Sequence, residues 1–330
     1  MTTKNLQQLF SNEIPVFLAP MAGVTDLPFR ELVKSFGASV VVSEMVSSEA
    51  LVRNSYKTYR RLANSGENSI NMVQIVGYDP DRMAEAARIN ENLGADVIDI
   101  NMGCPARKIT SNESGSALMK NESLALKIVE SVVKAVKIPV TVKMRLGWDS
   151  ENLNFQILAK NFENSGIQMV TIHCRTRNQM YSGHANWSAI SELKENLKIP
   201  YLCNGDIKTQ EDAETALSQS LANGIMIGRG ALGKPWLLKQ LMNSLNGKDI
   251  FPTPSLEDQY KIVMDHFKNT LDFYGETHGI CIFRKHFCWY TGGLVGSSRF
   301  RETINKATDI SFITDFVENF YANNSVKNRQ

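Results

Sequence analysis

Short, nearly continuous apolar runs recur along most of the chain, and stretches with helical spacing lie between them. The eight runs cover residues 16–21, 40–45, 70–76, 97–103, 140–146, 169–174, 201–206 and 224–229. Continuous hydrophobicity, as opposed to strict alternation, is typical of parallel strands that are covered on both faces. The pattern therefore predicts eight parallel strands that alternate with helices.

Two of the intervening stretches show the helical pattern clearly. One begins at Asp79, a candidate N-cap, and ends at Gly94, whereas the other keeps an apolar stripe from Glu122 and stops before Pro139. Eight strand–helix units over about 245 residues match an α/β fold of the (β/α)8 TIM barrel type, which takes roughly 250 residues. An open doubly wound sheet is the alternative, but it usually has fewer strands, and no GxGxxG follows a predicted strand here.

The pattern changes after the proline-rich segment KDIFPTPS, residues 248–255, because only helical spacing follows it. We therefore predict a barrel domain over residues 1–248 and a small helical domain over residues 249–330. The final residues, NNSVKNRQ (323–330), are polar and predict a frayed, disordered tail.

Composition narrows the class of protein. The chain has 330 residues, and 43% of them are hydrophobic, so it can bury a large core. Its net charge is +2, so no overall electrostatic field favours binding to nucleic acid or to a membrane. The five cysteines are odd in number and show no CxxC spacing, which disfavours a disulfide framework and a zinc site and suggests a reducing cytosol. No signal peptide or membrane span is apparent. We expect a soluble cytoplasmic protein, monomeric by default, with no metal.

Unusual polar residues fall where the predicted strands end. In a TIM barrel the reactive residues sit at the C-terminal ends of the strands. The residues found there are Pro20, Met21, Gln74, Asn101, Cys104, Lys143, Arg145, His173, Asn204, Gly205, Asp206, Gly228, Arg229 and Gly230. Because seven strand ends contribute, these side chains predict one shared pocket.

The turns after the seventh and eighth strands, NGD (204–206) and GRG (228–230), indicate an anion site. Barrels often bind a phosphate with these two loops, whose backbone N–H groups can face an anion while Arg229 adds a positive charge. Glycines that merely form tight turns are the alternative. The occurrence of both turns at the expected pair of strands favours the phosphate.

Lys143 and His173 each allow two interpretations. Lys143 lies inside an apolar strand, where it either forms a salt bridge with an Asp or Glu or stands beside a cofactor that gains negative charge, such as a reduced flavin. His173 either donates to a flavin or is a satisfied core histidine, and without its neighbours the second is the better interpretation.

Cys104 differs from the other cysteines, which we interpret as small buried apolar residues. Pro105 ends the strand directly behind it, so the thiol is expected at the pocket rim. With an ordinary pKa near 8.5 such a thiol is mostly protonated at neutral pH. Cys104 is therefore a candidate general acid.

Several motifs together resemble the tRNA-dihydrouridine synthase family. They are APMAGVTDLPFR (19–30), DINMGCPARK (99–108), GSALMK (115–120), VKMRLGWD (142–149), TIHCRTR (171–177), YSGHANW (181–187), NGDI (204–207) and MIGRGALGKPW (226–236). The likeness covers nearly the whole chain in order, and FRKHFCWYTGG (283–293) is similar to the helical domain of the bacterial subgroup B enzymes.

The resemblance implies a flavoenzyme that binds FMN in the barrel, is reduced by NADPH and reduces the C5=C6 bond of a uridine in the D-loop of tRNA. It implies Cys104 as the proton donor to C5, and substrate contacts at Asn101, Arg145 and Arg177. The implied FMN contacts are Pro20, Met21, Ala22, Gln74, Lys143, His173, Asn204, Gly205, Asp206, Gly228 and Arg229. Cys174 departs from the family, where glycine often follows the histidine, and is expected to narrow the space beside His173.

Two basic groups are candidates for tRNA phosphate binding. The first is RNSYKTYRR (53–61), with Arg53, Lys57, Arg60 and Arg61 beside two tyrosines. The second comprises Arg284, Lys285, His286, Arg299 and Arg301. Composition alone favours solvated helix faces, and the family resemblance favours RNA.

Three rival functions remain at this stage. A dihydroorotate-dehydrogenase-like enzyme would have the same barrel but little use for the helical domain. An RNA-binding barrel that has lost catalysis would contain no flavin. A metal-dependent barrel hydrolase ranks last, because clustered His and Asp ligands are missing from the predicted strand ends.

Overall fold

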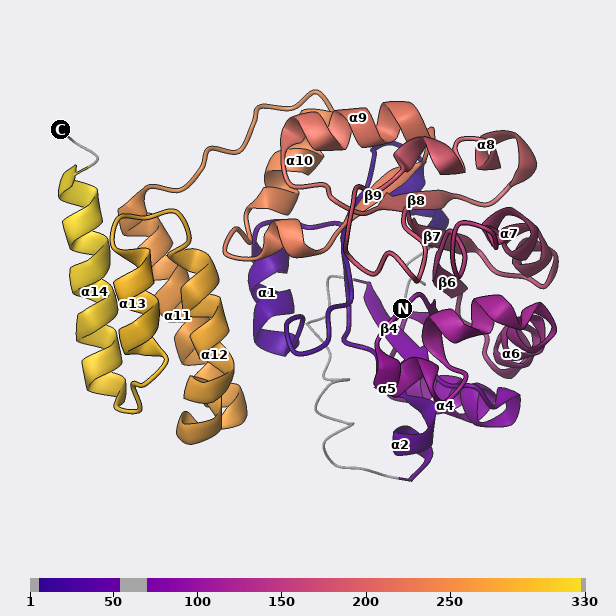
Figure 1. The fold of residues 1–330 in the computed structure, drawn as a ribbon, viewed down its shortest axis with the longest axis horizontal. Coiled ribbons are helices and arrows are strands. Elements are labelled where there is room, and N and C mark those ends of the chain that lie inside the picture. Colours follow the sequence, from indigo (N-terminus) through magenta and orange to yellow (C-terminus); the bar gives the residue numbers. More distant parts are fainter. Residues whose placement is uncertain (1–5, 54–69, 328–330) are drawn as a thin grey trace.

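The computed structural model describes residues 6–53 and 70–327, and its centre is a closed parallel barrel (Figure 1). The strands are β1 (Val16–Leu18), β2 (Val40–Val42), β3 (Val46–Ser47), β4 (Asn71–Val76), β5 (Val97–Met102), β6 (Val140–Arg145), β7 (Met169–His173), β8 (Tyr201–Asn204) and β9 (Gly224–Ile227). The pairing runs from β1 through β2 and β4 to β9, which pairs again with β1, while the short β3 lies beside β4. The predicted eight-stranded TIM barrel is confirmed.

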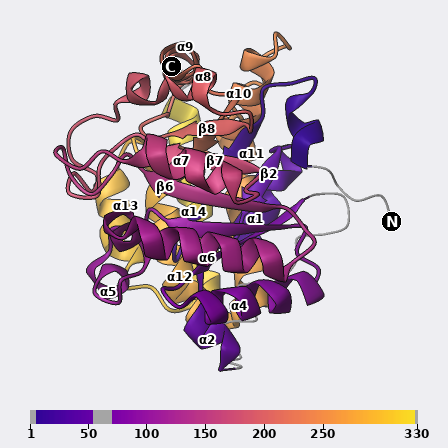
Figure 2. The same ribbon diagram turned by 90° about the vertical axis from the view of Figure 1, so that its right-hand side faces the viewer.

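Helices surround the barrel, and Figure 2 shows α4, α6 and α7 on the outer side of the strands. The α-helices of this part are α1 (Leu27–Ser35), α2 (Ser48–Val52), α4 (Pro80–Asn92), α5 (Arg107–Thr110), α6 (Glu122–Ala135), α7 (Phe155–Asn164), α8 (Leu193–Asn196), α9 (Gln210–Ser220) and α10 (Leu237–Leu245). The 3-10 helices are η1 (Leu6–Phe10), η2 (Gly115–Lys120), η3 (Trp187–Ile190) and η4 (Arg229–Ala231). Asp79 caps α4 through its side chain, as predicted.

The barrel interior changes from apolar to polar along the strands. Near the N-terminal end, an apolar cluster contains Leu6 of η1 and the strand residues Met72 and Val97. Two residues further along the same strands lie Gln74 and Asp99, and both are buried. Because side chains alternate between the two faces of a strand, each polar residue shares the inner face with the apolar residue before it. The strands therefore carry polar groups toward their C-terminal ends.

A group of helices follows the barrel and lies on one side of it (Figure 1). It consists of α11 (Leu256–Tyr274), α12 (Glu276–Tyr290), α13 (Ser297–Ile304) and α14 (Ile310–Lys327). These helices have a hydrophobic core of their own, to which Phe267, Phe283 and Phe287 contribute. The fold agrees with the predicted C-terminal helices, whereas the exact domain boundary near residue 249 stays a prediction.

Several strands end earlier than the sequence predicts, and two further details of the prediction are wrong. The predicted strand over residues 40–45 ends at Val42, and a separate two-residue strand, β3, follows it. Residues 323–327, predicted as a frayed tail, are the last residues of α14. There Asn324 hydrogen-bonds Val295 through its side chain, so a polar residue stabilises the helix end.

Candidate active site

A pocket of about 500 Å³ lies at the C-terminal ends of the barrel strands. It is lined by predicted site residues from seven strand ends or the loops after them: Pro20, Met21, Ala22, Gln74, Asn101, Cys104, Lys143, Arg145, His173, Asn204, Gly205, Asp206, Gly228 and Arg229. The predicted clustering at one rim is therefore confirmed. The contact of these residues with a cofactor stays a prediction.

Lys143 reaches the pocket from the inner face of β6. Its ammonium donates a hydrogen bond of 2.9 Å to Asn204 Oδ1, and Asn204 in turn donates to the Met226 carbonyl. No carboxylate lies within ion-pair distance of Lys143 in residues 6–53 and 70–327, so the salt-bridge interpretation is wrong for this part of the chain. Burial, with the neighbouring Arg145 charge, lowers the pKa of Lys143 to about 8. A lysine with one hydrogen-bond partner has further N–H groups for a ligand.

His173 lines the same pocket at the end of β7. Burial lowers the pKa of His173 well below its ordinary value, and the positive charges of Lys143, Arg145, Arg175 and Arg229 add to this effect. The imidazole is therefore neutral at pH 7, with one ring nitrogen as a donor and the other as an acceptor. Arg175, which can only donate, lies 3.5 Å from His173 Nε2. His173 is a pocket residue rather than an ordinary core histidine.

Cys104 lies at the pocket rim, as its sequence position predicts. Asn101 Oδ1 accepts hydrogen bonds from the backbone N–H groups of Gly103 and Cys104, at 3.1 and 2.9 Å. The Cys104 carbonyl accepts two more, from the N–H and hydroxyl of Ser116. Burial raises the pKa of the Cys104 thiol above its ordinary value. The thiol is therefore held in a defined turn and keeps its proton at neutral pH.

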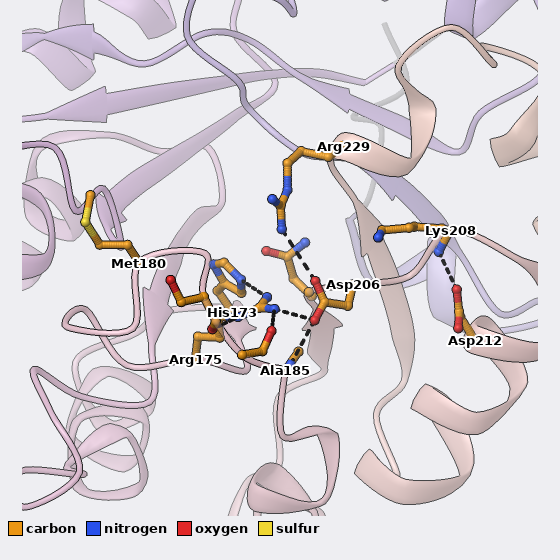
Figure 3. A network of polar contacts seen from close by, with 12 residues as sticks. His173, Arg175, Met180, Ala185, Asp206, Lys208, Asp212 and Arg229 are labelled. Atoms are coloured by element: carbon orange, nitrogen blue, oxygen red, sulfur yellow. Dashed lines mark hydrogen bonds and ion pairs between the residues drawn. The ribbon is translucent and has the colours of Figure 1, made fainter. Parts of the chain in front are cut away.

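Figure 3 shows an arginine that the sequence analysis missed. Arg175 is buried and donates to the carbonyls of Ser182 and Gly183, at 3.1 and 2.7 Å, while it forms an ion pair with Asp206. Asp206 also accepts from the Ala185 N–H and lies 3.4 Å from Arg229. The network fixes the loop after β7 to the end of β8. In the sequence, the indication of this role is that Arg175 lies two residues after His173, which was predicted to be a pocket residue.

Arg145 is a second organiser of the rim. Its guanidinium donates to the Gly103 carbonyl at 2.7 Å and to the carbonyls of Thr176 and Met180 at 2.9 Å each. It also lies 5.7 Å from the ring centroid of Tyr181, which is 53% exposed at the pocket mouth. Arg145 therefore joins the loops that carry Cys104 and Tyr181.

Cys174 does not narrow the space beside His173, so that expectation is wrong. Its side chain is fully buried, and its sulfur lies 3.6 Å from the sulfur of Cys203 on the neighbouring strand. Adjacent residues of a strand point to opposite faces, so Cys174 faces the helices while His173 faces the pocket.

Of the predicted tRNA contacts, Asn101 and Arg145 line this pocket, whereas the others lie outside it. Arg177 packs its guanidinium 4.4 Å above the Trp148 ring. Arg284 donates to the Ala307 carbonyl, and Lys285 donates to the Gly23 carbonyl of the barrel. His286 is buried between α12 and the barrel, beside Phe29, so it is out of reach of a phosphate on the surface.

The remaining basic residues of both groups can be placed only in part. Arg299 and Arg301 are exposed on α13, and Arg53 is exposed near Glu49. Lys57, Arg60 and Arg61 lie outside the described residues. In the part that the structure describes, three or more His, Cys, Asp or Glu side chains nowhere gather as metal ligands would, and no helix there could cross a membrane.

A closed parallel barrel with a pocket at the C-terminal ends of its strands defines the class of the protein, an α/β barrel. Comparison with known families gives a match to the dihydrouridine synthase (Dus) model over residues 17–324. A probable tRNA-dihydrouridine synthase of Rickettsia bellii is 49% identical over 96% of both chains. The tRNA-dihydrouridine synthase B of Pasteurella multocida is 46% identical over 89% of both chains.

The chain belongs to the dihydrouridine synthase family, a family of oxidoreductases, so the predicted resemblance is confirmed. Solved structures agree in fold alone. A 2-naphthoyl-CoA reductase superposes with a TM-score of 0.54 at 13% identity, over 70% of this chain and 50% of the reductase. A histamine dehydrogenase from Rhizobium superposes with a TM-score of 0.52 at 14% identity, over 77% of this chain and 48% of the dehydrogenase.

Proposed function

We propose that this protein is a tRNA-dihydrouridine synthase that reduces the C5=C6 bond of a uridine in the tRNA D-loop. The observation that carries the proposal is the convergence of Cys104, Lys143 and His173 on one pocket, in a chain whose relatives bear this name over nearly their full length. The rims of unrelated barrels differ in chemistry, so the combination of family and site supports this function more strongly than the fold does.

The pocket suits FMN as the bound cofactor. Its donor set combines the Lys143 ammonium, which has N–H groups to spare, with Arg229 and the glycine-containing turns after β8 and β9. We propose that FMN is held by Pro20, Met21, Ala22, Gln74, Lys143, His173, Asn204, Gly205, Asp206, Gly228 and Arg229, and that NADPH is the diffusible reductant. When bound, FMN supplies the hydride for C6 of the uracil.

The protein's own residues complete the reaction. A hydride at C6 leaves negative charge at C5 and O4, and the Cys104 thiol donates its proton to C5, so that the uracil gains two electrons and two hydrogen atoms. Lys143 holds a positive charge beside the region that gains electrons. Asn101 lies next to Cys104 and positions both the cysteine and the base.

We propose that the target uridine is flipped into the pocket and that the rest of the tRNA lies along the barrel rim and the helices from α11 onward. Exposed Arg299 and Arg301, together with Arg177, Arg284 and Lys285, contribute the positive charge. The free cysteines suit a reducing compartment, and we propose the cytoplasm, where tRNA is the available substrate.

The decisive experiment incubates the purified protein with FMN, NADPH and tRNA from cells that lack dihydrouridine. We expect a yellow protein, NADPH oxidation that depends on tRNA, and one or more D-loop uridines that gain the mass of two hydrogen atoms. A protein that reduces or oxidises free orotate derivatives but leaves tRNA unchanged would overturn the proposal. A colourless protein that binds tRNA without NADPH oxidation would also reject it.

A further inference from the structure

A chain of hydrogen bonds runs from the barrel interior to Cys104. Thr141 Oγ1 donates to Asp99 Oδ1 at 2.6 Å, and Gln74 Nε2 donates to Asp99 Oδ2 at 2.7 Å. Asn101 Nδ2 donates to Gln74 Oε1 at 2.7 Å, and Asn101 Oδ1 accepts from the backbone of Cys104. Asp99, Gln74, Asn101 and Thr141 are all buried. The chain therefore lies in a region where unpaired polar groups are costly.

The two ends of this chain determine the orientation of both amides. At one end the backbone N–H groups of Gly103 and Cys104 can only donate, so Asn101 must present its oxygen to them. At the other end Asp99 Oδ2 accepts from Gln74, so Gln74 must present its NH2 group to Asp99 and its oxygen to Asn101. Between the ends, the Asn101 NH2 then meets the Gln74 oxygen. A single arrangement satisfies every group, and it requires an acceptor at residue 99.

The environment of Asp99 sets this carboxylate apart from an ordinary ion-pair partner. Burial raises its pKa, while the hydrogen bonds from Thr141 and Gln74 and the nearby Lys143 charge act in the opposite direction. Lys143 does not approach within ion-pair distance in the described residues, so both carboxylate oxygens are engaged by neutral donors. Asp99 also lies outside the set of pocket-lining residues. It therefore acts through its hydrogen bonds.

We propose that Asp99 is a positioning residue, whose carboxylate orients the Gln74 and Asn101 amides and thereby holds the Cys104 turn at the pocket rim. The inference rests on the proposed role of Cys104 as proton donor. If residue 99 offers no acceptor, the Gln74 NH2 group loses its partner, the Gln74 and Asn101 amides can turn over, and an NH2 group can then face the two backbone N–H groups. The turn that carries Cys104 loses its anchor.

Two substitutions of similar size test this mechanism as a pair. Asp99→Leu removes the acceptor, so Gln74 Nε2 loses its partner and the two amides lose their fixed orientation. Asp99→Asn keeps the acceptor, because its amide oxygen can face Gln74 while its NH2 group donates to the Thr141 hydroxyl, which can accept. Only Asp99→Leu therefore releases the Asn101 amide.

The first readout is the alkylation rate of Cys104 by iodoacetamide, measured by peptide mass spectrometry, since it does not depend on tRNA activity. We expect Asp99→Leu to expose the thiol and raise this rate several-fold, and Asp99→Asn to stay within about two-fold of the original protein, because it keeps the acceptor for Gln74. The second readout is single-turnover uridine reduction, which should fall roughly ten-fold or more in Asp99→Leu and much less in Asp99→Asn. Asp81→Asn, on the exposed face of α4, is the matched control and should change neither rate.

An Asp99→Leu variant that reacts at the original rate would overturn the proposal. If Asp99→Leu does not fold, Asp99→Asn decides, because an Asp99→Asn variant that is alkylated several-fold faster than the original protein contradicts the mechanism. Failure of the proposed function itself has a different signature. The starting protein would then form no dihydrouridine, while the alkylation pattern would still hold.

Discussion

At the scale of single residues, Cys104 is the group with the most specific proposed task. It lies at the pocket rim, and burial raises the pKa of its thiol, so the proton stays available at neutral pH. We expect Cys104→Ala to keep FMN and the half-reaction in which NADPH is oxidised by the flavin, but to slow uridine reduction roughly a hundred-fold or more, the usual range for a lost general acid. Dihydrouridine formed per unit of time in pre-reduced enzyme is the measurement. Cys281→Ala, at an exposed position on α12, is the control, and full activity of Cys104→Ala would reject the assignment.

Lys143 supports a prediction about pH. Its pKa is lowered to about 8, so the ammonium loses its proton as the pH rises through this value. A negative charge on a bound flavin moves the transition upward. We expect flavin reduction by NADPH to decline at or above about pH 8, and to be slow at every pH in Lys143→Ala. The test is the stopped-flow absorbance of the flavin between about pH 6 and about pH 10, a range that brackets this pKa. Lys143→Arg keeps its charge, so a decline of equal size in that variant would contradict this explanation.

Some site residues were predictable because they violate a local pattern, while others were missed. Cys104 and Lys143 are chemically unusual at the ends of apolar runs, and their clustering follows from parallel strands. Asp99 carried the same signal, a carboxylate inside a buried strand, but its task depends on partners from two other strands. His286 was misread as a surface cation. Its spacing from Phe283 and Tyr290, three and four residues, is that of a buried helix face, which all three share.

At the scale of elements, the loop after β7 is held by two arginines. Arg145 spans from the Gly103 carbonyl to the Met180 carbonyl, and Arg175 joins Ser182 and Gly183 to Asp206. A lysine side chain ends in a single nitrogen, so it cannot donate to the carbonyls of two separate loops as the planar guanidinium does. The loop therefore depends on arginine geometry as well as on charge.

We expect Arg145→Lys to slow uridine reduction by roughly ten-fold while it changes NADPH-dependent flavin reduction much less, because it frees the loops on the side of Cys104 and Tyr181. Hydrogen exchange of backbone amides 176–182 should rise in parallel. Arg88→Lys, at an exposed position of α4, is the control. Equal losses in the two half-reactions would show that Arg145 serves the flavin instead.

The sequence predicted the elements better than their ends. All eight barrel strands were found because both faces of a parallel strand are apolar. Their C-terminal ends were predicted too long wherever the run continued into the site, as at residues 19–21, because loop residues there are also buried or apolar. The two-residue strand β3 is too short for any periodic signal. The last turns of α14 are polar but hydrogen-bonded, which hydrophobicity cannot reveal.

At the scale of the whole molecule, the barrel and the C-terminal helices meet at α1. Phe29 of α1 packs against the rings of His266 and His286, at centroid distances of 5.6 Å each, and Lys285 donates to the Gly23 carbonyl of the barrel. The loop that contains Gly23 continues from Met21 and Ala22 at the pocket. The position of the helices is therefore coupled to the rim of the proposed active site.

This interface should be sensitive to acid. Burial lowers the pKa of His266 to about 3, while its Nδ1 pairs with the Tyr290 hydroxyl at 3.0 Å. An unfolded histidine titrates near 6.5, so between about 6.5 and 3 the unfolded chain binds a proton that the folded chain refuses. The stability present above pH 6.5 is thus lost as the pH falls, by about 2 kcal/mol at pH 5 for this one residue.

The comparison of variants isolates this contribution, because Asp26 at the same interface acts in the opposite sense. Burial raises its pKa to about 6, so it stabilises the folded chain as the pH falls below that value. The double variant His266→Phe/Tyr290→Phe removes the titrating ring together with the hydroxyl that would lose its partner. We expect its free energy of unfolding in urea to fall less between pH 7 and pH 5 than that of the original protein, by about 2 kcal/mol. Tyr290→Phe alone keeps the histidine and should keep most of the acid sensitivity. If the double variant and Tyr290→Phe lose equal stability on acidification, His266 is not the titrating group, and the acid response belongs elsewhere in the interface.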